Sequence, residues 1–197
     1  MPTAFRNELG TLTHRLADLC GLVAAAFEEA TRSVLESDHT LGGRAREQAA
    51  AAAALGAACE DQACALLALH APREGEVKAV VAAVHTAASL TRMGGLAAEV
   101  AEPRGPVPAD ARPMLGRLGT HAVAAARALR DVLAGGDAGG LGEAVALAAA
   151  AERELREWAR GGGDALDVVL LAADYGRFAA ATARIGRRVA VFAPAGA

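Results

Sequence analysis

Apolar residues recur at spacings of three, four and seven along most of this chain, and this periodicity restricts the fold more than any other feature. One clear run covers about residues 3–36, with Phe5, Leu9, Leu12 and Leu16 on a single stripe. Such a stripe is typical of a helix that buries one face. Alanine supplies most of the 53% apolar residues, whereas aromatic residues make up 3%. Because alanine favours helices and is poor in strands, the sequence predicts an all-α fold.

Proline and glycine divide the chain near its middle, where residues 105–110 read Gly-Pro-Val-Pro-Ala-Asp. This combination ends one helix and can start another. Helices are expected at about residues 3–36, 40–70, 73–102, 107–134 and 141–160, with a sixth that ends near residue 192. The repeated plan indicates duplication of a three-helix unit, with units at residues 1–104 and 105–197. Short turns favour antiparallel packing, so we expect a tandem repeat of two three-helix bundles with six helices.

The charge and the N-terminal sequence restrict partners and location. Twenty basic residues against 23 acidic ones give a net charge of −3, which provides no electrostatic reason to expect nucleic-acid binding. The N-terminus lacks an apolar segment of signal-peptide type, and this predicts a cytoplasmic protein. The longest apolar run, residues 49–59, is mostly alanine and shorter than the roughly twenty residues of a membrane span. We therefore expect no direct membrane insertion.

No catalytic constellation can be assembled from the spacing of reactive residues. Serine occurs only at Ser33, Ser37 and Ser89, none of them in a Gly-x-Ser-x-Gly setting. One Glu-x-x-His motif, at residues 36–39, lies at an expected helix end, whereas di-iron bundles use two such motifs within helices. The sequence therefore predicts a protein that is not an enzyme and uses no cofactor.

A specific resemblance lies in residues 76–102, which read EVKAVVAAVHTAASLTRMGGLAAEVAE. This stretch is similar, in register, to the helix D-L-R-x-V-V-A-A-L-R-I-x-x-D-L-E-R-I-G-D-L-A-x-x-I-A-E of the PhoU family of phosphate-transport regulators. The matched positions are Glu76, Val77, Lys78, Val80, Val81, Ala82, Ala83, Leu90, Arg92, Met93, Gly94 and Glu102. Residues 60–72 also resemble the family's I-E-x-x-C-L-x-L-L-A-L-Q-Q-P segment, whereas the second half of the chain is more diverged.

The resemblance implies the family's tandem three-helix fold and an adaptor function. It implies a cytoplasmic negative regulator that couples a phosphate ABC transporter ATPase to a sensor histidine kinase and limits phosphate uptake. It also implies a homodimer. Two alternatives stay open: a metal-binding helical bundle, and a PhoU paralogue that serves another transporter or kinase.

The carboxylates of the family's metal-binding motif are missing from this chain. The motif is an acidic pair spaced i, i+4 on one helix face in each half, and carboxylate oxygens suit hard metal ions. The corresponding residues here are Thr91, Gly95, Gly176 and Ala180, with Ser89 at a further acidic position. We therefore expect no metal cluster of the family type.

Arg92 and Arg177 occupy equivalent places in the two third helices and need an explanation. The residue pattern favours a structural role, either as side-chain stems packed on a neighbouring helix or as ion pairs with an acid such as Glu60 or Asp61. An anion site is a further alternative that the sequence leaves open. Glu60 and Glu76 are candidates for partner contacts or, more simply, for solvated helix faces and helix caps. Trp158, the single tryptophan, is expected in the core, with a partner contact as the alternative.

Overall fold

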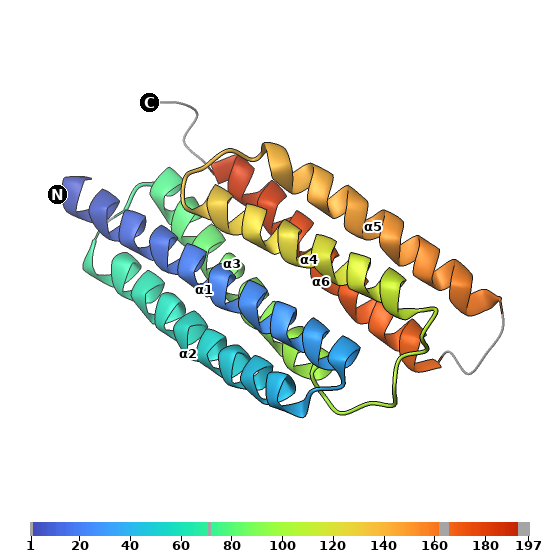
Figure 1. Ribbon diagram of the computed structural model, residues 1–197. Coiled ribbons are helices and arrows are strands. Elements are labelled where there is room, and N and C mark those ends of the chain that lie inside the picture. The colour runs from blue at the N-terminus through green and yellow to red at the C-terminus, as the bar shows by residue number, and fades with distance from the viewer. Residues whose placement is uncertain (1, 71, 162–165, 193–197) are drawn as a thin grey trace.

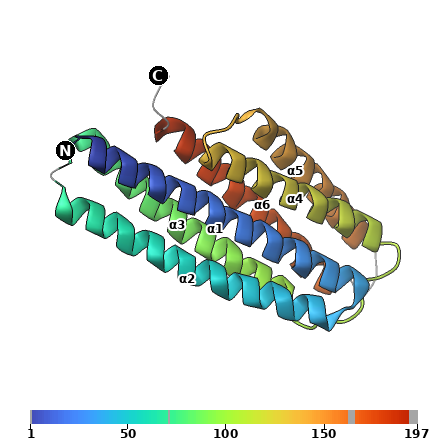
Figure 2. The same ribbon diagram turned by 60° about the vertical axis from the view of Figure 1, so that its left-hand side comes forward.

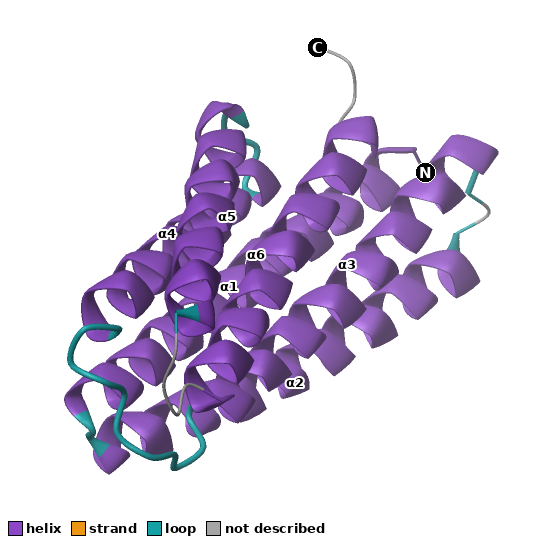
Figure 3. Cartoon of the chain, turned by 90° about the vertical axis from the view of Figure 1, so that its right-hand side faces the viewer, coloured by secondary structure: helices purple, strands orange, loops and turns teal. Residues whose placement is uncertain are grey.

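The computed structural model describes residues 2–70, 72–161 and 166–192. Within these residues the chain forms helices and no strand (Figures 1 and 3). The helices are α1 (Pro2–Glu36), α2 (His39–Leu69), α3 (Glu74–Val100), α4 (Arg112–Leu133), α5 (Gly139–Arg160) and α6 (Leu166–Phe192). The prediction of an all-α protein with six helices is confirmed.

The helices pack as two bundles of three that lie side by side (Figures 1 and 2). Helices α1, α2 and α3 contact one another, and so do α4, α5 and α6. The bundles meet along two further contacts, α1 with α4 and α3 with α6. We propose that the two bundles correspond to the repeats expected at residues 1–104 and 105–197.

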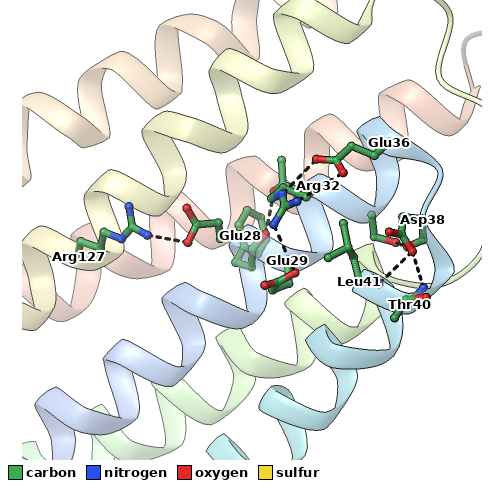
Figure 4. Close-up of polar contacts among 11 residues, drawn as sticks. Glu28, Glu29, Arg32, Glu36, Asp38, Thr40, Leu41 and Arg127 are labelled. Carbon is green, nitrogen blue, oxygen red and sulfur yellow. Dashed lines mark hydrogen bonds and ion pairs between the residues drawn. The ribbon is translucent and has the colours of Figure 1, made fainter.

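Local sequence signals set several helix ends. Asp38 caps α2, because its side chain accepts hydrogen bonds from the backbone N–H of Thr40 at 2.8 Å and of Leu41 at 3.4 Å (Figure 4). These bonds lower the pKa of the Asp38 carboxyl, with the Thr40 bond contributing most. The polar turn after α1 therefore determines where α2 begins.

The start of α4 differs from the expectation. The helix begins at Arg112 and not near residue 107, and Pro113 lies in its first turn. Residues 103–108 have no regular secondary structure, because Pro106 and Pro108 lack backbone donors and disfavour helix in the residue before each of them. Val107 is nevertheless 4% exposed, so this connection between the bundles is packed against the core.

The bundles share one hydrophobic core, which is made largely of alanine and leucine. Phe27 of α1 stacks on Phe178 of α6 with ring centroids 3.8 Å apart, and meets Tyr175 edge-on at 4.8 Å. The buried Tyr175 hydroxyl donates to Thr31 Oγ1 at 3.0 Å. At the surface, Arg127 of α4 forms an ion pair with Glu28 of α1 at 2.6 Å (Figure 4). These contacts join helices from different bundles.

Helix α2 has a largely apolar, exposed outer side. Among the described residues it is the one helix that is long and apolar enough to cross a membrane, with a mean hydropathy of 1.3 over 18 residues. Its apolar character comes mainly from alanine, which is also common in the helices of water-soluble bundles. The helix packs along α1 and α3. The absence of direct membrane insertion stays a prediction.

Candidate functional site

A cavity of about 730 Å³ lies between α3, α5 and α6. Five arginines and two glutamates line it, together with small and aliphatic residues. The charged residues are Arg92 and Glu99 of α3, Glu152 and Arg156 of α5, and Arg177, Arg184 and Arg188 of α6. We call this cavity the arginine groove. Its charged side chains sum to +3, opposite in sign to the net charge of −3 for the whole chain.

Helix periodicity explains why the groove is basic. Arg177, Arg184 and Arg188 are spaced by seven and four residues, which places them on one face of α6. Arg92 and Glu99 are likewise seven residues apart on α3, and α3 packs against α6. One face of α3 and one face of α6 therefore supply charged side chains to the arginine groove.

Two of the five arginines are held by carboxylates. Arg177 bonds to Asp174 one turn earlier and lies 4.0 Å from Glu99 Oε2 of α3. The bond to Asp174 raises the pKa of the Arg177 guanidinium, so this side chain stays charged. On α5, Arg156 binds Glu152 at 2.5 Å. These pairs fix two guanidinium groups along the wall of the groove.

Arg92 does not pair with Glu60 or Asp61, an ion pair that was one of the alternatives left open by the sequence. Its guanidinium donates to Ser89 Oγ at 3.1 Å, and no ion pair forms with it in the described part of the chain. The reason is the direction of the side chain. Thr91 faces Gly56 of α2, and because successive helix residues are about 100° apart, Arg92 turns toward α6.

The positions that carry metal ligands in the family do not fit a metal cluster here. The Thr91 hydroxyl is buried over Gly56 and has no hydrogen-bond partner among the described residues. At Gly95 no atom lies within 4 Å of where a Cβ would be, so this position faces open space. In the second bundle the Glu152 carboxylate occupies the space of a side chain at Gly176, while the neighbouring position is Ala180. Within the described residues, no three His, Cys, Asp or Glu side chains are grouped to hold a metal ion.

The remaining candidates lie elsewhere. Glu76 accepts a hydrogen bond from the backbone N–H of Arg73 at 2.8 Å and so caps the start of α3. Glu60 is half-buried on α2, away from the arginine groove. Trp158 packs partly against the core, and its indole N–H donates to Asp110 Oδ2 at 3.0 Å, which ties the end of α5 to the turn before α4.

Arg156, Arg184 and Arg188 were not among the residues predicted from the sequence. The spacing of Arg177, Arg184 and Arg188 could have indicated a basic face on α6. Arg156 and Glu152 had no such signal, because their place beside α6 depends on how α5 packs.

The fold and this site define a class of protein, in which two three-helix bundles lie in tandem and the third helix of each bundle carries charged residues. The chain belongs to the PhoU family. The PhoU domain model matches residues 16–103. A "Phosphate-specific transport system accessory protein PhoU homolog 2" of Mycobacterium tuberculosis is 33% identical over all of this chain and 99% of its own length. The "PhoU homolog 1" of Mycobacterium leprae is 32% identical over 96% of this chain and 92% of its own length.

Solved structures agree on the fold. The crystal structure of PhoU from Pseudomonas aeruginosa is 19% identical, with a TM-score of 0.78, and covers 95% of this chain and 98% of its own. The phosphate transport system regulatory protein PhoU from Streptococcus pneumoniae is 18% identical, also with a TM-score of 0.78, and covers 95% and 96%. The predicted family and the tandem three-helix fold are thereby confirmed.

Proposed function

We propose that this protein is a cytoplasmic negative regulator of phosphate uptake and phosphate-starvation signalling. In this role it binds the ATPase of a phosphate ABC transporter and a sensor histidine kinase, so that the state of one partner biases the other. Membership of the PhoU family supports this proposal. It is also supported by the relatives that this chain matches over nearly their whole length, because they are named accessory proteins of phosphate-specific transport. A homodimer is part of the proposal.

The single observation that carries the adaptor role is the outer side of α2. A run of its alanines is exposed, at positions 50, 51, 53, 54, 57 and 58. Leu67 and Leu69 continue this surface with 37% and 77% exposure. We call these residues the α2 face. Monomeric proteins rarely leave a large contiguous apolar surface uncovered, and such surfaces are typical of protein contacts.

Small side chains make the α2 face suited to another helix. Alanine lets a second helix axis approach closely, and ordering an alanine costs almost no side-chain entropy. An adaptor needs such a surface more than it needs a reaction centre.

Capture of partners from cells in high and low phosphate tests the role. We expect the tagged protein to retain a transporter ATPase and a histidine kinase, and the Ala54→Arg/Ala58→Arg double variant to lose at least one of them. Both positions are exposed, so the variant is expected to fold. Ala146→Arg/Ala150→Arg on the exposed side of α5 is the matched control, with the same spacing and charge change.

Other outcomes decide against the proposal. Retention of both partners by the α2 double variant would remove the α2 face from the mechanism. A partner set with another transporter or kinase would instead identify a paralogue with a different client. Sedimentation of the purified protein tests the homodimer separately.

The metal-binding alternative is not favoured. Thr91, Gly95, Gly176 and Ala180 provide one hydroxyl between them, and that hydroxyl is buried against α2. The proposed mechanism therefore includes no metal ion.

A further inference from the structure

We propose that the arginine groove binds a small anion that carries two or more linked phosphoryl groups. This inference goes beyond the adaptor role and depends on neither the kinase nor the transporter.

Three arginines of the groove have no carboxylate partner in the described part of the chain. Arg92 donates only to Ser89 Oγ, and within the described residues Arg184 and Arg188 form no hydrogen bond or ion pair. The other two, Arg156 and Arg177, are already paired with acids. The groove therefore presents three uncompensated guanidinium groups from two facing helices, and like charges gathered in one cavity repel until an anion neutralises them.

Both acidic side chains of the groove lie beside arginines that they pair with. Glu152 lies over Gly176 and is bound by Arg156, and its side chain is 20% exposed. A residue larger than glycine at position 176 would displace this carboxylate. Glu99 lies beside Arg177. Each acid is thus matched with one arginine, and neither neutralises Arg92, Arg184 or Arg188.

Guanidinium groups favour phosphoryl oxygens, because their planar fork of N–H donors binds two oxygens at once. The size of the cavity favours more than one phosphoryl group. A volume of about 730 Å³ is in the range of pockets that bind whole small molecules, roughly 300–1,000 Å³.

The lining argues against a nucleotide. Among the residues that the structure describes, no aromatic side chain lines the groove, and aromatic rings are the side chains on which bases usually stack. Its uncharged residues are small or aliphatic, among them Met93, Leu96 and Ile185. We therefore expect an inorganic oligophosphate to bind at least as tightly as a nucleoside triphosphate of the same charge.

Titration calorimetry of the full-length protein, in a metal-free buffer at low salt, tests the proposal. The probes are orthophosphate, pyrophosphate, tripolyphosphate, ATP and fructose 1,6-bisphosphate. We expect affinity to rise from orthophosphate to tripolyphosphate, ATP to gain nothing over tripolyphosphate, and binding to weaken as salt increases. Comparison of pyrophosphate with the bisphosphate shows whether the groove requires phosphoryl groups that are directly linked or also accepts two that are held apart on a sugar.

The variant for the test is Arg92→Gln/Arg184→Gln, which removes one unpaired charge from α3 and one from α6. Both side chains are exposed, so we expect it to fold, and its thermal unfolding checks this. The matched control is Arg153→Gln/Arg187→Gln, which removes two exposed arginines from α5 and α6 outside the groove. We expect at least a tenfold loss of tripolyphosphate affinity in the first variant and less than a twofold change in the second.

Three results would overturn the proposal. These are equal affinity of both double variants for tripolyphosphate, no saturable binding of any phosphoryl probe, and tighter binding of a polyglutamate peptide than of tripolyphosphate. The last would show that the groove accepts acidic protein segments. Partner capture plays no part in this test, so the adaptor role and the oligophosphate site can fail separately.

Discussion

Replacement of Phe178 by alanine is expected to destabilise the protein strongly, because its ring joins the two bundles. Phe178 of α6 is 0% exposed and stacks on Phe27 of α1 with centroids 3.8 Å apart. Aromatic residues are only 3% of the chain, so few other side chains of this size fill the core. Phe178→Ala would leave a cavity beside the Phe27 ring, in a close-packed core whose other side chains cannot extend to fill it.

The expected loss is about 3–5 kcal/mol in the free energy of unfolding, the usual range for a buried phenylalanine cut to alanine. For a chain of 197 residues, each kcal/mol lowers Tm by roughly 2–4 °C, so we expect a shift of about 6–20 °C. The aromatic pair should contribute about 0.5–1.5 kcal/mol beyond burial. A double-mutant cycle with Phe27→Leu and Phe178→Leu would measure that coupling.

Urea unfolding followed by far-UV circular dichroism, with a thermal scan, gives both quantities. Leu170→Ala is the control on the same helix, because its side chain is 47% exposed, and we expect a change within about 0.5 kcal/mol. The reasoning is refuted if Phe178→Ala costs less than about 1.5 kcal/mol, half the lower bound for such a cavity, or no more than Leu170→Ala does. Either result would mean that the bundles do not depend on this ring.

Three further predictions follow from packing and burial. Gly119→Ala in α4 should lower the unfolding free energy by about 1–3 kcal/mol in urea titrations, because its Cβ would lie 2.5 Å from Thr31 Cγ2 in a packed site; an unchanged midpoint would show that α1 and α4 can separate. A thiol reagent at pH 8 should label only Cys64 in the native protein, since Cys20 and Cys59 are buried, and all three thiols in denaturant. Burial raises the pKa of the Cys20 thiol from 9.0 to about 12, so stability should fall as pH rises above about 9, where only the unfolded thiol ionises; Cys20→Ala should reduce that slope in unfolding measured from pH 8 to 11.

The helices could be read from the sequence almost to their ends. Apolar spacing gave α1 as residues 3–36 against Pro2–Glu36 in the structure, and Asp38 stood where a cap was needed. The exception was the start of α4, expected at 107 and found at Arg112. A proline can either open a helix or hold an extended connection, and here the burial of Val107 accompanies the extended form.

The site was less predictable than the fold. The sequence showed that carboxylates were absent from the family's motif positions, and it marked Arg92 and Arg177 as unexplained. The sequence left open whether Arg92 packs on a neighbouring helix or pairs with an acid such as Glu60, because sequence cannot show which neighbouring helix a residue faces. The approach of Glu152 to Gly176 joins residues 24 positions apart on different helices, and no local pattern indicates it.

The sequence by itself determined what repeats along a helix: six amphipathic helices, and the Asp38 cap at the start of α2. This is so because helical periodicity and capping depend on residues within a turn or two of one another. Only the tertiary structure decided that α3 and α6 lie together, that their arginines share one cavity, and that its acids are held at the wall. Those features depend on the packing of side chains between helices that are distant in the chain, and periodicity contains no information about that packing.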